Sequence, residues 1–370
     1  MQNNDLISSV KVSPATEATE GFNNLPTAPY QPLGGNRAAG VIDELRGMVN
    51  EPKRLFDRVF SRFVNSPDFN YNLAEELAKA GRFKDALLRL KINLWIKKNH
   101  FKSHYLMGCC YIALDDKVKA KQSFVNAASL NENDLENNFM LASLDPYIVP
   151  SNRQPTTMPL KIAQDYFSGI AESYEVTQAQ AGYRAHQLAD QAVWEVLSRR
   201  RNNYEVLDLG CGTGLAGVLL AEHADYIVGV DFCKSMLDYA GMKRRPSGLR
   251  IYTETICDDL RLYIADARTN RFDAIIAAHV FNYVGEIAWV FDGVARSLKE
   301  GGVFVFQVER YANDGYYGLL GGYGRFGHSD GYIRQHIERV GLYLTGVDLV
   351  NVFPNYQMVQ YVVRKPPIND

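Results

Sequence analysis

The sequence predicts an α/β fold with a mainly parallel sheet, preceded by an all-α region. An apolar run at residues 205–209 leads into a glycine-rich turn and then an apolar helical pattern, which is typical of a buried strand, a tight turn and a helix. Strand and helix patterns then alternate from about residue 186 to 366, as expected for a parallel sheet with helices on both faces. An internal repeat between residues 73 and 124 predicts the all-α region.

The composition fits a chain with two or more hydrophobic cores, because 46% of its 370 residues are hydrophobic. A formal net charge of −2 gives no support for a surface that binds nucleic acid or an anionic membrane, so we expect neither partner. No apolar stretch approaches ~18 residues and the N-terminus lacks a signal pattern, which favours a soluble, cytoplasmic protein. Five cysteines without a C-x-x-C pair indicate neither a disulfide framework nor a bound metal.

The first part of the chain is predicted to be disordered. Residues 1–37 are rich in Asn, Ser, Thr, Pro and Gly and show little apolar periodicity. An amphipathic helical pattern follows at 41–64, and Pro52 interrupts it, so two helices are expected there. We interpret these helices as a cap on the helical region that follows, with a helix lying on a membrane as the alternative.

The internal repeat has a period of 34 residues. Small residues recur where paired helices would approach closely, and large apolar residues recur where they would fill the gap between the helices. The equivalent positions are Leu73, Ala74, Leu77, Gly81, Ala86 and Leu90 in the first unit and Met107, Gly108, Tyr111, Asp115, Ala120 and Phe124 in the second. This pattern resembles the tetratricopeptide (TPR) repeat, which implies an all-α domain of two to three units at 38–148. Such units would bind a protein partner or act as a purely structural cap, and both readings stay open.

The glycine-rich turn has the composition of a ligand-binding loop. Gly212, Gly214 and Gly217 satisfy the pattern G-x-G-x-x-G, and Asp231 follows at roughly the 20-residue distance expected of a ribose-binding acid. Glycines let a ligand approach the main chain closely, and the next helix offers free N–H groups at its first turn. The turn therefore predicts a nucleotide-like ligand, and by itself it leaves a nicotinamide-dependent oxidoreductase open.

Further motifs follow the turn in a fixed order. They are Asp208-Leu209-Gly210-Cys211-Gly212-Thr213-Gly214, the strand Tyr226–Asp231 with Ser235-Met236-Leu237 after it, the strand Phe272–Ala278, and the turn Leu298–Gly302. Together they resemble the class I S-adenosylmethionine-dependent methyltransferases. The resemblance implies S-adenosylmethionine as the cofactor and a Rossmann-like seven-stranded sheet whose last strand is antiparallel. It predicts a methyltransferase domain at 162–370, with lid helices at 162–200 and a core at 201–370. Three prolines within residues 149–161 predict that this segment is the linker before it.

The resemblance also implies which core residues bind the cofactor. The glycine turn would face the methionine part of the cofactor, Asp231 would accept hydrogen bonds from both ribose hydroxyls, and Met236 would pack against the adenine. An Asp after the third strand would accept from the adenine amino group; the spacing favours Asp259 and leaves Asp258 open. The candidates are Asp208, Gly210, Cys211, Gly212, Gly214, Asp231, Met236, Asp258, Asp259, Leu260 and Ala278.

Two more cofactor candidates lie in the predicted lid. The stretch Asp165–Glu175 and the later Gly182-Tyr183-Arg184 resemble the helices that precede the core in TPR-bearing methyltransferases. Tyr166 and Arg184 are therefore expected to reach the cofactor or a carboxylate, since Arg offers a planar, two-pronged donor. Packing within the lid and a surface ion pair are the alternative roles of these two side chains.

Candidates for the methyl acceptor site follow the fourth and fifth strands. His279 ends the fourth strand, where the family places residues near the transferred methyl group, and Tyr283 comes soon after it. The sequence GRFGHS around Arg325 and His328 resembles the GRFAHS loop of the TPR-bearing group, so both would suit a carboxylate or another anionic acceptor. His279 and His328 are the catalytic candidates, and a structural role or a contact with the cofactor is the alternative for His279. The Gly- and Tyr-rich run at 314–324 predicts a mobile, aromatic wall.

The leading functional hypothesis is an S-adenosylmethionine-dependent methyltransferase that acts on a small molecule or a protein. The TPR-bearing group it resembles is often described as trans-aconitate-methyltransferase-like, which would make the acceptor a carboxylate. The alternative from another class is a non-catalytic adaptor, in which the TPR-like units bind a partner while the core binds the cofactor for stability or sensing. The intact glycine turn and Asp231 argue against a decayed site but not against a sensor.

Overall fold

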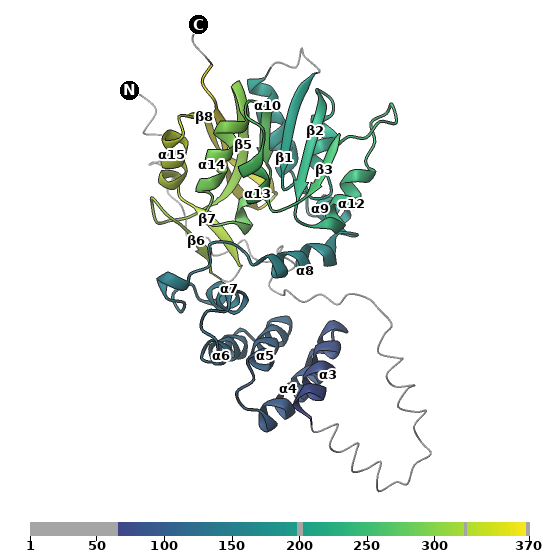
Figure 1. Ribbon diagram of the computed structural model, residues 1–370, viewed down its shortest axis with the longest axis vertical. Helices are drawn as coiled ribbons and strands as arrows, with labels where there is room; N and C mark the ends of the chain where they lie inside the picture. The colour runs from purple at the N-terminus through teal and green to yellow at the C-terminus, as the bar shows by residue number, and fades with distance from the viewer. Residues whose placement is uncertain (1–65, 198–202, 322–323, 368–370) are drawn as a thin grey trace.

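The computed structural model describes residues 66–197, 203–321 and 324–367. A helical part, α3 to α7, lies below a sheet part in the view of Figure 1, and α8 leads from one into the other. The predicted disordered segment 1–37 and the predicted helices at 41–64 fall outside the described residues. The helices before the sheet are α3 (Pro67–Lys79), α4 (Phe83–Ile96), α5 (Phe101–Ala113), α6 (Lys117–Ala128), α7 (Leu135–Leu144), the 3-10 turn η1 (Ser151–Arg153), α8 (Leu160–Ile170), α9 (Tyr174–Gln180) and α10 (Ala185–Val196).

Close packing at small residues explains the helical part. α3 packs against α4 and α5 against α6, as two successive helical hairpins. Ala74, Ala86 and Ala120 have no exposed surface. A Cβ atom at Gly108 would lie 2.5 Å from the ring of Phe124, so a glycine lets α5 and α6 approach this closely. The hairpins therefore form around the residues that the internal repeat singled out.

The sheet is mixed, with parallel strands at its centre. Its order is β3-β2-β1-β4-β5, and each of these neighbouring pairs is parallel. β9 pairs antiparallel with β5, and β8 pairs antiparallel with β9, as expected for the last two strands of the predicted seven. A short hairpin of β6 and β7 extends the end of β5 beyond these seven. The strands are β1 (Tyr204–Leu209), β2 (Ala224–Asp231), β3 (Glu254–Cys257), β4 (Phe272–Ala277), β5 (Leu298–Arg310), β6 (Tyr317–Leu320), β7 (Arg325–His328), β8 (Tyr343–Phe353) and β9 (Tyr356–Arg364).

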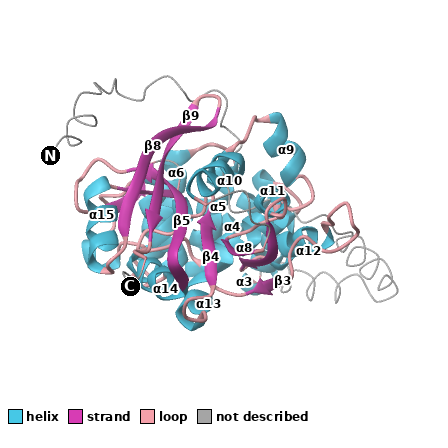
Figure 2. Cartoon of the chain, turned by 90° about the horizontal axis from the view of Figure 1, so that it is seen from above, coloured by secondary structure: helices cyan, strands magenta, loops and turns pink. Residues whose placement is uncertain are grey.

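Helices cover both faces of the sheet (Figure 2). Residues of α13, α14 and α15 share one buried cluster with the central strands, and residues of α10, α11 and α12 share another. Central parallel strands are therefore buried on both sides, which explains their continuous apolar runs. The remaining helices are α11 (Leu215–Leu220), α12 (Lys234–Met242), α13 (Leu260–Asp266), the 3-10 turn η2 (Phe281–Tyr283), α14 (Ala288–Ser297) and α15 (Asp330–Arg339).

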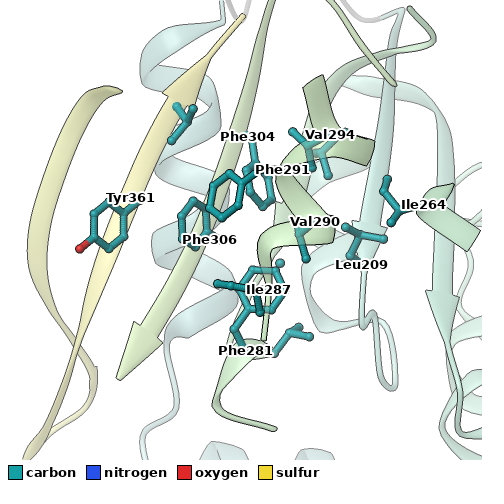
Figure 3. Close-up of a cluster of buried hydrophobic side chains, with 14 of the residues drawn as sticks. Leu209, Ile264, Phe281, Ile287, Val290, Phe291, Val294, Phe304, Phe306 and Tyr361 are labelled. Atoms are coloured by element: carbon teal, nitrogen blue, oxygen red, sulfur yellow. The ribbon is translucent and has the colours of Figure 1, made fainter. Parts of the chain in front are cut away.

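Aromatic rings fill the larger of these clusters (Figure 3). Phe281, Phe291, Phe304 and Phe306 have no exposed surface. The rings of Phe304 and Phe306 stack with their centroids 4.6 Å apart, and Phe306 stacks in turn on Tyr361 of the antiparallel strand β9. Each buried phenylalanine contributes ~1.5–3 kcal/mol relative to an exposed one, so this cluster holds β4, β5 and β9 rigidly under the loops that follow them.

The β6–β7 hairpin joins the sheet part to the helical part. The predicted mobile wall at 314–324 is, in its described residues, largely the strand β6 and its connections. Leu319 and Phe326 of the hairpin are buried in the same cluster as residues of α3 to α7. The rings of Phe326 and Phe139 lie 6.4 Å apart. Side chains of the hairpin therefore pack in the hydrophobic core of the helical part.

Neither a membrane-spanning helix nor a metal cluster occurs in the three described ranges. None of the helices in these ranges combines the length and the apolar character needed to cross a bilayer. No three His, Cys, Asp or Glu side chains of the same ranges gather as ligands for a metal ion. The cysteines are free thiols, of which Cys257 is exposed and Cys109, Cys110, Cys211 and Cys233 are buried.

Candidate active site

A cavity of about 410 Å³ lies at the carboxyl ends of the central strands, where ligand sites of open α/β sheets form. Loops after β1, β2 and β4 line it, and α8 with the segment before it closes the side toward the helices. The cavity brings together the predicted site residues Tyr166, Gly210, Gly212, Asp231, Met236, Asp259, Leu260, Ala278, His279 and Tyr283. The predicted residues that do not line it are Arg184, Asp208, Cys211, Gly214, Asp258, Arg325 and His328.

The turn after β1 has glycine at the three positions where its backbone lies in the left-handed region. The φ angle is +70° at Gly210, +55° at Gly212 and +87° at Gly214. The N–H groups of Gly210 and Cys211 both donate to the carbonyl oxygen of Val230, which fixes the turn against the end of β2. No atom lies within 4 Å of the Cβ position at Gly212, so the main chain is open to the cavity at this point.

Asp231 connects the loop after β2 to the glycine turn. Its Oδ2 accepts a hydrogen bond from the N–H of Gly212 at 2.9 Å, and its Oδ1 accepts one from the N–H of Cys233 at 2.8 Å. Burial raises the pKa of this carboxyl to about 6, although the two N–H groups oppose the rise. A carboxylate oxygen accepts more than one hydrogen bond, so both oxygens keep capacity for the hydroxyl groups of a ligand.

Tyr252 supports the glycine turn from below, and the sequence analysis assigned it no role. Its hydroxyl donates to Oδ2 of Asp208 at 2.7 Å and accepts from the N–H of Gly217 at 3.2 Å. A Cβ atom at Gly214, Gly217 or Gly229 would come within 2.8 Å of this tyrosine. Burial raises the pKa of Asp208 to about 7, and the hydrogen bond from Tyr252 opposes that rise. Gly214, Gly217 and Gly229 lie on neighbouring elements and together leave room for one large ring, and this was the feature of the sequence that could have indicated Tyr252.

The turn after β3 separates the two adjacent acids. Asp259 and Leu260 line the cavity, whereas Asp258 does not. Oδ1 of Asp258 accepts a hydrogen bond from the N–H of Asp259 at 2.8 Å, so it stabilises the turn itself. Oδ1 of Asp259 accepts from the N–H of Arg261 and caps α13. Met236 lines the same end of the cavity and is 1% exposed. This arrangement favours Asp259 over Asp258 as the acid that faces a ligand.

Helix α8 closes the cavity with aromatic side chains. Tyr166 and Phe167 line it, and the Phe167 ring meets Tyr283 edge-on with the centroids 5.2 Å apart. Arg184, by contrast, is exposed at the N-terminal end of α10 and does not line the cavity. Of the two lid candidates, the structure therefore brings Tyr166 to the cavity and leaves Arg184 outside it.

His279 combines an unusual backbone conformation with a buried ring nitrogen. Its φ is +61°, which is uncommon for a residue with a side chain. The imidazole packs against Tyr183 and Phe353, and its Nε2 has no hydrogen-bond partner among the described residues. Burial and the nearby charge of Arg325 lower the pKa of His279 to about 3. The ring is therefore neutral at pH 7, and its unprotonated nitrogen can accept a hydrogen bond from a bound molecule.

Arg325 and His328 are engaged away from the cavity. Nε of Arg325 lies 3.0 Å from Oε1 of Glu309, and the guanidinium lies over the ring of Tyr356. Nε2 of His328 donates to the carbonyl oxygen of Gly285 at 2.9 Å, and burial lowers the pKa of this histidine to about 4. Neither side chain lines the cavity, although the charge of Arg325 is close enough to act on His279.

The far wall of the cavity comes partly from the predicted linker. We call residues 156–158 the strap. The N–H of Glu286 donates to the carbonyl oxygen of Thr156, and the N–H of Met158 donates to that of Tyr283, both at 2.9 Å. These bonds hold the strap against the loop that follows β4, and the strap lines the cavity.

Glu286 and Trp289 complete the far wall. Nε1 of Trp289 donates to the carbonyl oxygen of Glu286 at 2.7 Å, and Oε1 of Glu286 accepts from the N–H of Ala288 at 2.8 Å. Neither side chain was among the predicted site residues, and the strap was expected to be part of a linker. No local motif marks them, because the strap and this loop lie far apart in the chain; Thr157 and Tyr283, for example, are separated by 126 positions.

Comparison with known proteins gives a family for the sheet part. Residues 207–306 match the family model described as "Methyltransferase domain". The ubiquinone biosynthesis O-methyltransferase of Coxiella burnetii is 33% identical over 102 residues, which cover 28% of this chain and 42% of that enzyme. The enzyme of the same name from Haemophilus ducreyi is 29% identical over 108 residues, which cover 29% and 46%. The chain thus spans less than half the length of these curated relatives.

Solved structures with a similar fold cover about half of the chain. Magnesium protoporphyrin IX methyltransferase (ChlM) from Synechocystis PCC 6803 is 15% identical with a TM-score of 0.44, over 56% of this chain and 96% of that one. A TehB-like SAM-dependent methyltransferase from Corynebacterium glutamicum is 21% identical with a TM-score of 0.39, over 54% and 98%. Residues 207–306 of this chain thus match a methyltransferase domain, and the sheet order and glycine turn around them are those expected of the class I S-adenosylmethionine-dependent methyltransferases.

Proposed function

We propose that this protein transfers a methyl group from S-adenosylmethionine to a small molecule bound at the far wall of the same cavity. The observation that carries the proposal is that one cavity is lined by two kinds of surface. Gly212 and Asp231 offer open backbone and a carboxylate, which suit the polar parts of a nucleoside. Tyr283 and Trp289 offer an aromatic surface beside the strap, which suits a second molecule.

The residues at the glycine turn fit the cofactor. We assign the ribose hydroxyls to Asp231, the adenine to Asp259, Leu260 and Met236, and the methionine part to the open backbone at Gly212. The positive φ angles of the turn and the open space above Gly212 support this assignment. When bound, the cofactor supplies an electrophilic methyl group on a sulfonium sulfur.

The protein contributes orientation and the exclusion of water to such a transfer. Half-buried aromatic side chains of the wall shield the acceptor from water, which strengthens polar contacts made inside the cavity. A histidine with a pKa of about 3 is a poor general base at pH 7. We therefore assign His279 the task of accepting a hydrogen bond that orients the acceptor, rather than of removing its proton.

Oxygen is the acceptor atom that we propose. The curated relatives are named O-methyltransferases, which supports this choice. A trans-aconitate-like activity would make that oxygen part of a carboxylate, and a phenol or alcohol is the other class of oxygen acceptor. A protein acceptor would have to present one side chain to the same aromatic wall.

We further propose that α3 to α7 are TPR-like units. The 34-residue offset and the tight approach of Phe124 to Gly108 support this interpretation. These helices also complete the cavity, because their shared core includes Met158 of the strap and Ile162 of α8. A protein partner on their outer surface and a cytoplasmic location stay predictions.

The proposal is tested by calorimetric titration of the full chain with S-adenosylhomocysteine, run beside NADH. We expect micromolar binding of the first ligand and no binding of the second. Transfer of a labelled methyl group from S-adenosylmethionine to a panel of acceptors then measures activity. Binding of NADH alone would overturn the proposal, and binding of neither ligand would favour the adaptor.

A further inference from the structure

The far wall of the cavity has a single charged side chain among its described residues, and that charge is negative. The wall consists of the strap with Tyr283, Val284, Glu286 and Trp289. The other side chains there are aromatic, aliphatic or hydroxyl-bearing. The hydrogen bond from the N–H of Ala288 holds the Glu286 carboxylate in place at the start of α14.

Positive charge is scarce throughout the cavity lining. Within the described lining residues, Arg261 is the one Lys or Arg, and it is exposed on α13 beside the residues assigned to the adenine. Asp231 and Asp259 add carboxylates at the same end. His279 is neutral at pH 7. An organic acid at the far wall would therefore lose its hydration without gaining a cation, which is strongly unfavourable.

Arg325 and His328, the other basic side chains considered for an anion site, already have partners. Arg325 and Glu309 are 6% and 5% exposed and form a buried ion pair, so each charge is offset by the other. His328 is 1% exposed, donates to the carbonyl of Gly285 and is neutral at pH 7 because burial lowers its pKa. Neither side chain lines the cavity, and the Arg325 charge that acts on His279 is offset by Glu309, so an acid at the far wall gains no direct contact with either side chain.

We propose that the methyl acceptor is an aromatic molecule without negative charge, and that Glu286 determines this specificity by rejecting organic acids. The inference rests on the proposed function and adds the substrate class to it. Phe167 and Tyr283 are already packed edge to face, and Trp289 adds a third ring to the lining, so a planar ring finds partners of the geometry that aromatic groups prefer. A hydroxyl or an amine on that ring is compatible with Glu286, whereas a carboxylate is repelled.

The test is a calorimetric titration of the full chain, saturated with S-adenosylhomocysteine, with three indoles of similar size. Tryptophol is uncharged, tryptamine is a cation and indole-3-acetate is an anion at pH 7. We expect tryptophol or tryptamine to bind at least ~10-fold more tightly than indole-3-acetate, a difference of about 1.4 kcal/mol. Comparing the affinities of tryptophol and tryptamine shows whether the site prefers a hydroxyl-bearing acceptor or an amine. trans-Aconitate, an acid without a ring, is expected not to bind.

A matched pair of variants assigns the effect to Glu286. Glu286→Gln keeps the oxygen that accepts from Ala288 and removes only the charge. We expect it to bind indole-3-acetate roughly 5- to 10-fold more tightly, since a repulsion between like charges near a protein surface is worth about 1 kcal/mol or more. Glu338→Gln makes the same change on the exposed face of α15 and should leave all three affinities unchanged.

Three results would overturn the inference. They are binding of indole-3-acetate or trans-aconitate as tight as that of tryptophol, an unchanged preference in Glu286→Gln, and binding of none of the indoles to a protein that binds S-adenosylhomocysteine. Failure of the wild-type chain to bind S-adenosylhomocysteine would contradict the proposed function instead. The same titrations therefore separate the two failures.

Discussion

The cofactor end of the cavity comes from short stretches that each follow a strand directly, whereas the acceptor end comes from segments far apart in the chain. Gly210 and Gly212 follow β1, Asp231 ends β2, and Asp259 follows β3. The acceptor end is assembled when the strap meets the loop after β4, where Thr157 and Tyr283 are 126 positions apart in the chain.

This difference explains which end can be recognised in a sequence. A strand, a glycine turn and the next helix fix one another's geometry within about 15 residues, so the residue types alone indicate the chemistry. The strap and Glu286 become neighbours only because the whole helical part packs on the sheet. The cofactor end is therefore a local structure, and the acceptor end is a product of the complete fold.

The largest effect is expected from Asp231→Ala. The change removes the carboxylate assigned to the ribose and releases the N–H groups of Gly212 and Cys233. We expect the affinity for S-adenosylhomocysteine to fall at least ~100-fold, because two or more hydrogen bonds to a charged group are lost. Calorimetry measures the affinity, and circular dichroism during heating checks that the variant folds. A variant that folds and binds normally would show that the cofactor does not lie over β2.

A smaller loss is expected from Tyr252→Phe, which keeps the ring beneath the glycine turn and deletes its hydroxyl. Asp208 and the N–H of Gly217 then lose a buried partner, which costs ~1–3 kcal/mol of unfolding free energy. We expect S-adenosylhomocysteine to bind about 10-fold more weakly as the turn loosens. Tyr239→Phe, a 38% exposed tyrosine on α12, is the matched control. Equal behaviour of the two variants would mean that the turn holds its shape without Tyr252.

The pH dependence of binding tests Asp231 without a mutation. Burial raises the pKa of Asp231 to about 6, and the ionised carboxylate is the form that accepts hydrogen bonds from ribose hydroxyls. The affinity for S-adenosylhomocysteine should therefore fall as the pH drops through 6, by up to roughly tenfold between pH 7 and pH 5. Isothermal titrations at several pH values measure this. A flat profile over that window would contradict the assigned contact.

The contribution of Asp208 to the free energy of unfolding should fall as the pH rises, whereas the cofactor affinity should increase. Burial raises the pKa of Asp208 to about 7, above its ordinary value in an unfolded chain, so the folded state binds more protons between about pH 4 and pH 7. The contribution of this group to the free energy of unfolding therefore falls as the pH rises through that range. Asp208→Asn removes the titration and should gain stability relative to wild type from pH 5 to pH 8. Denaturant unfolding of both proteins measures the difference, and a constant difference would refute it.

The smallest effect on the cofactor is expected from Trp289→Phe at the acceptor end. The variant keeps a ring in the wall and loses the hydrogen bond from Nε1 to the carbonyl oxygen of Glu286. We expect the affinity for S-adenosylhomocysteine to stay within about twofold, while the affinity for an indole falls several-fold, as one hydrogen bond is worth ~1 kcal/mol. A large loss of cofactor affinity would show that the two ends of the cavity are coupled.

The residues that could be predicted from sequence are those whose role depends on local structure. The glycine turn and Asp231 were found because a buried strand and a following helix bracket them. Arg325 and His328 have residue types that suit an anion site, but Glu309 and the carbonyl of Gly285 engage them first. Such a partner is visible only after the hairpin has packed on β5, and no pattern around the two residues indicates it.

The same reasoning explains why the strands could be predicted and the far wall could not. Strands β1, β2 and β4 are buried on both sides and therefore appear as continuous apolar runs. The strap has no such pattern, and its Pro-containing sequence resembles an ordinary connection between domains. Its position becomes apparent only from its backbone hydrogen bonds to the loop after β4.

The β6–β7 hairpin also affects whether the helical part and the sheet part can evolve as separate domains. Leu319 and Phe326 belong to the buried cluster of the helices, so a gene encoding the sheet part alone would produce a protein with an aromatic face exposed to water and a cavity open on one side. Recombination within residues 149–161 would divide the buried cluster that contains Val149, Met158 and Phe326. Selection for activity would therefore keep the two parts together as one evolutionary unit.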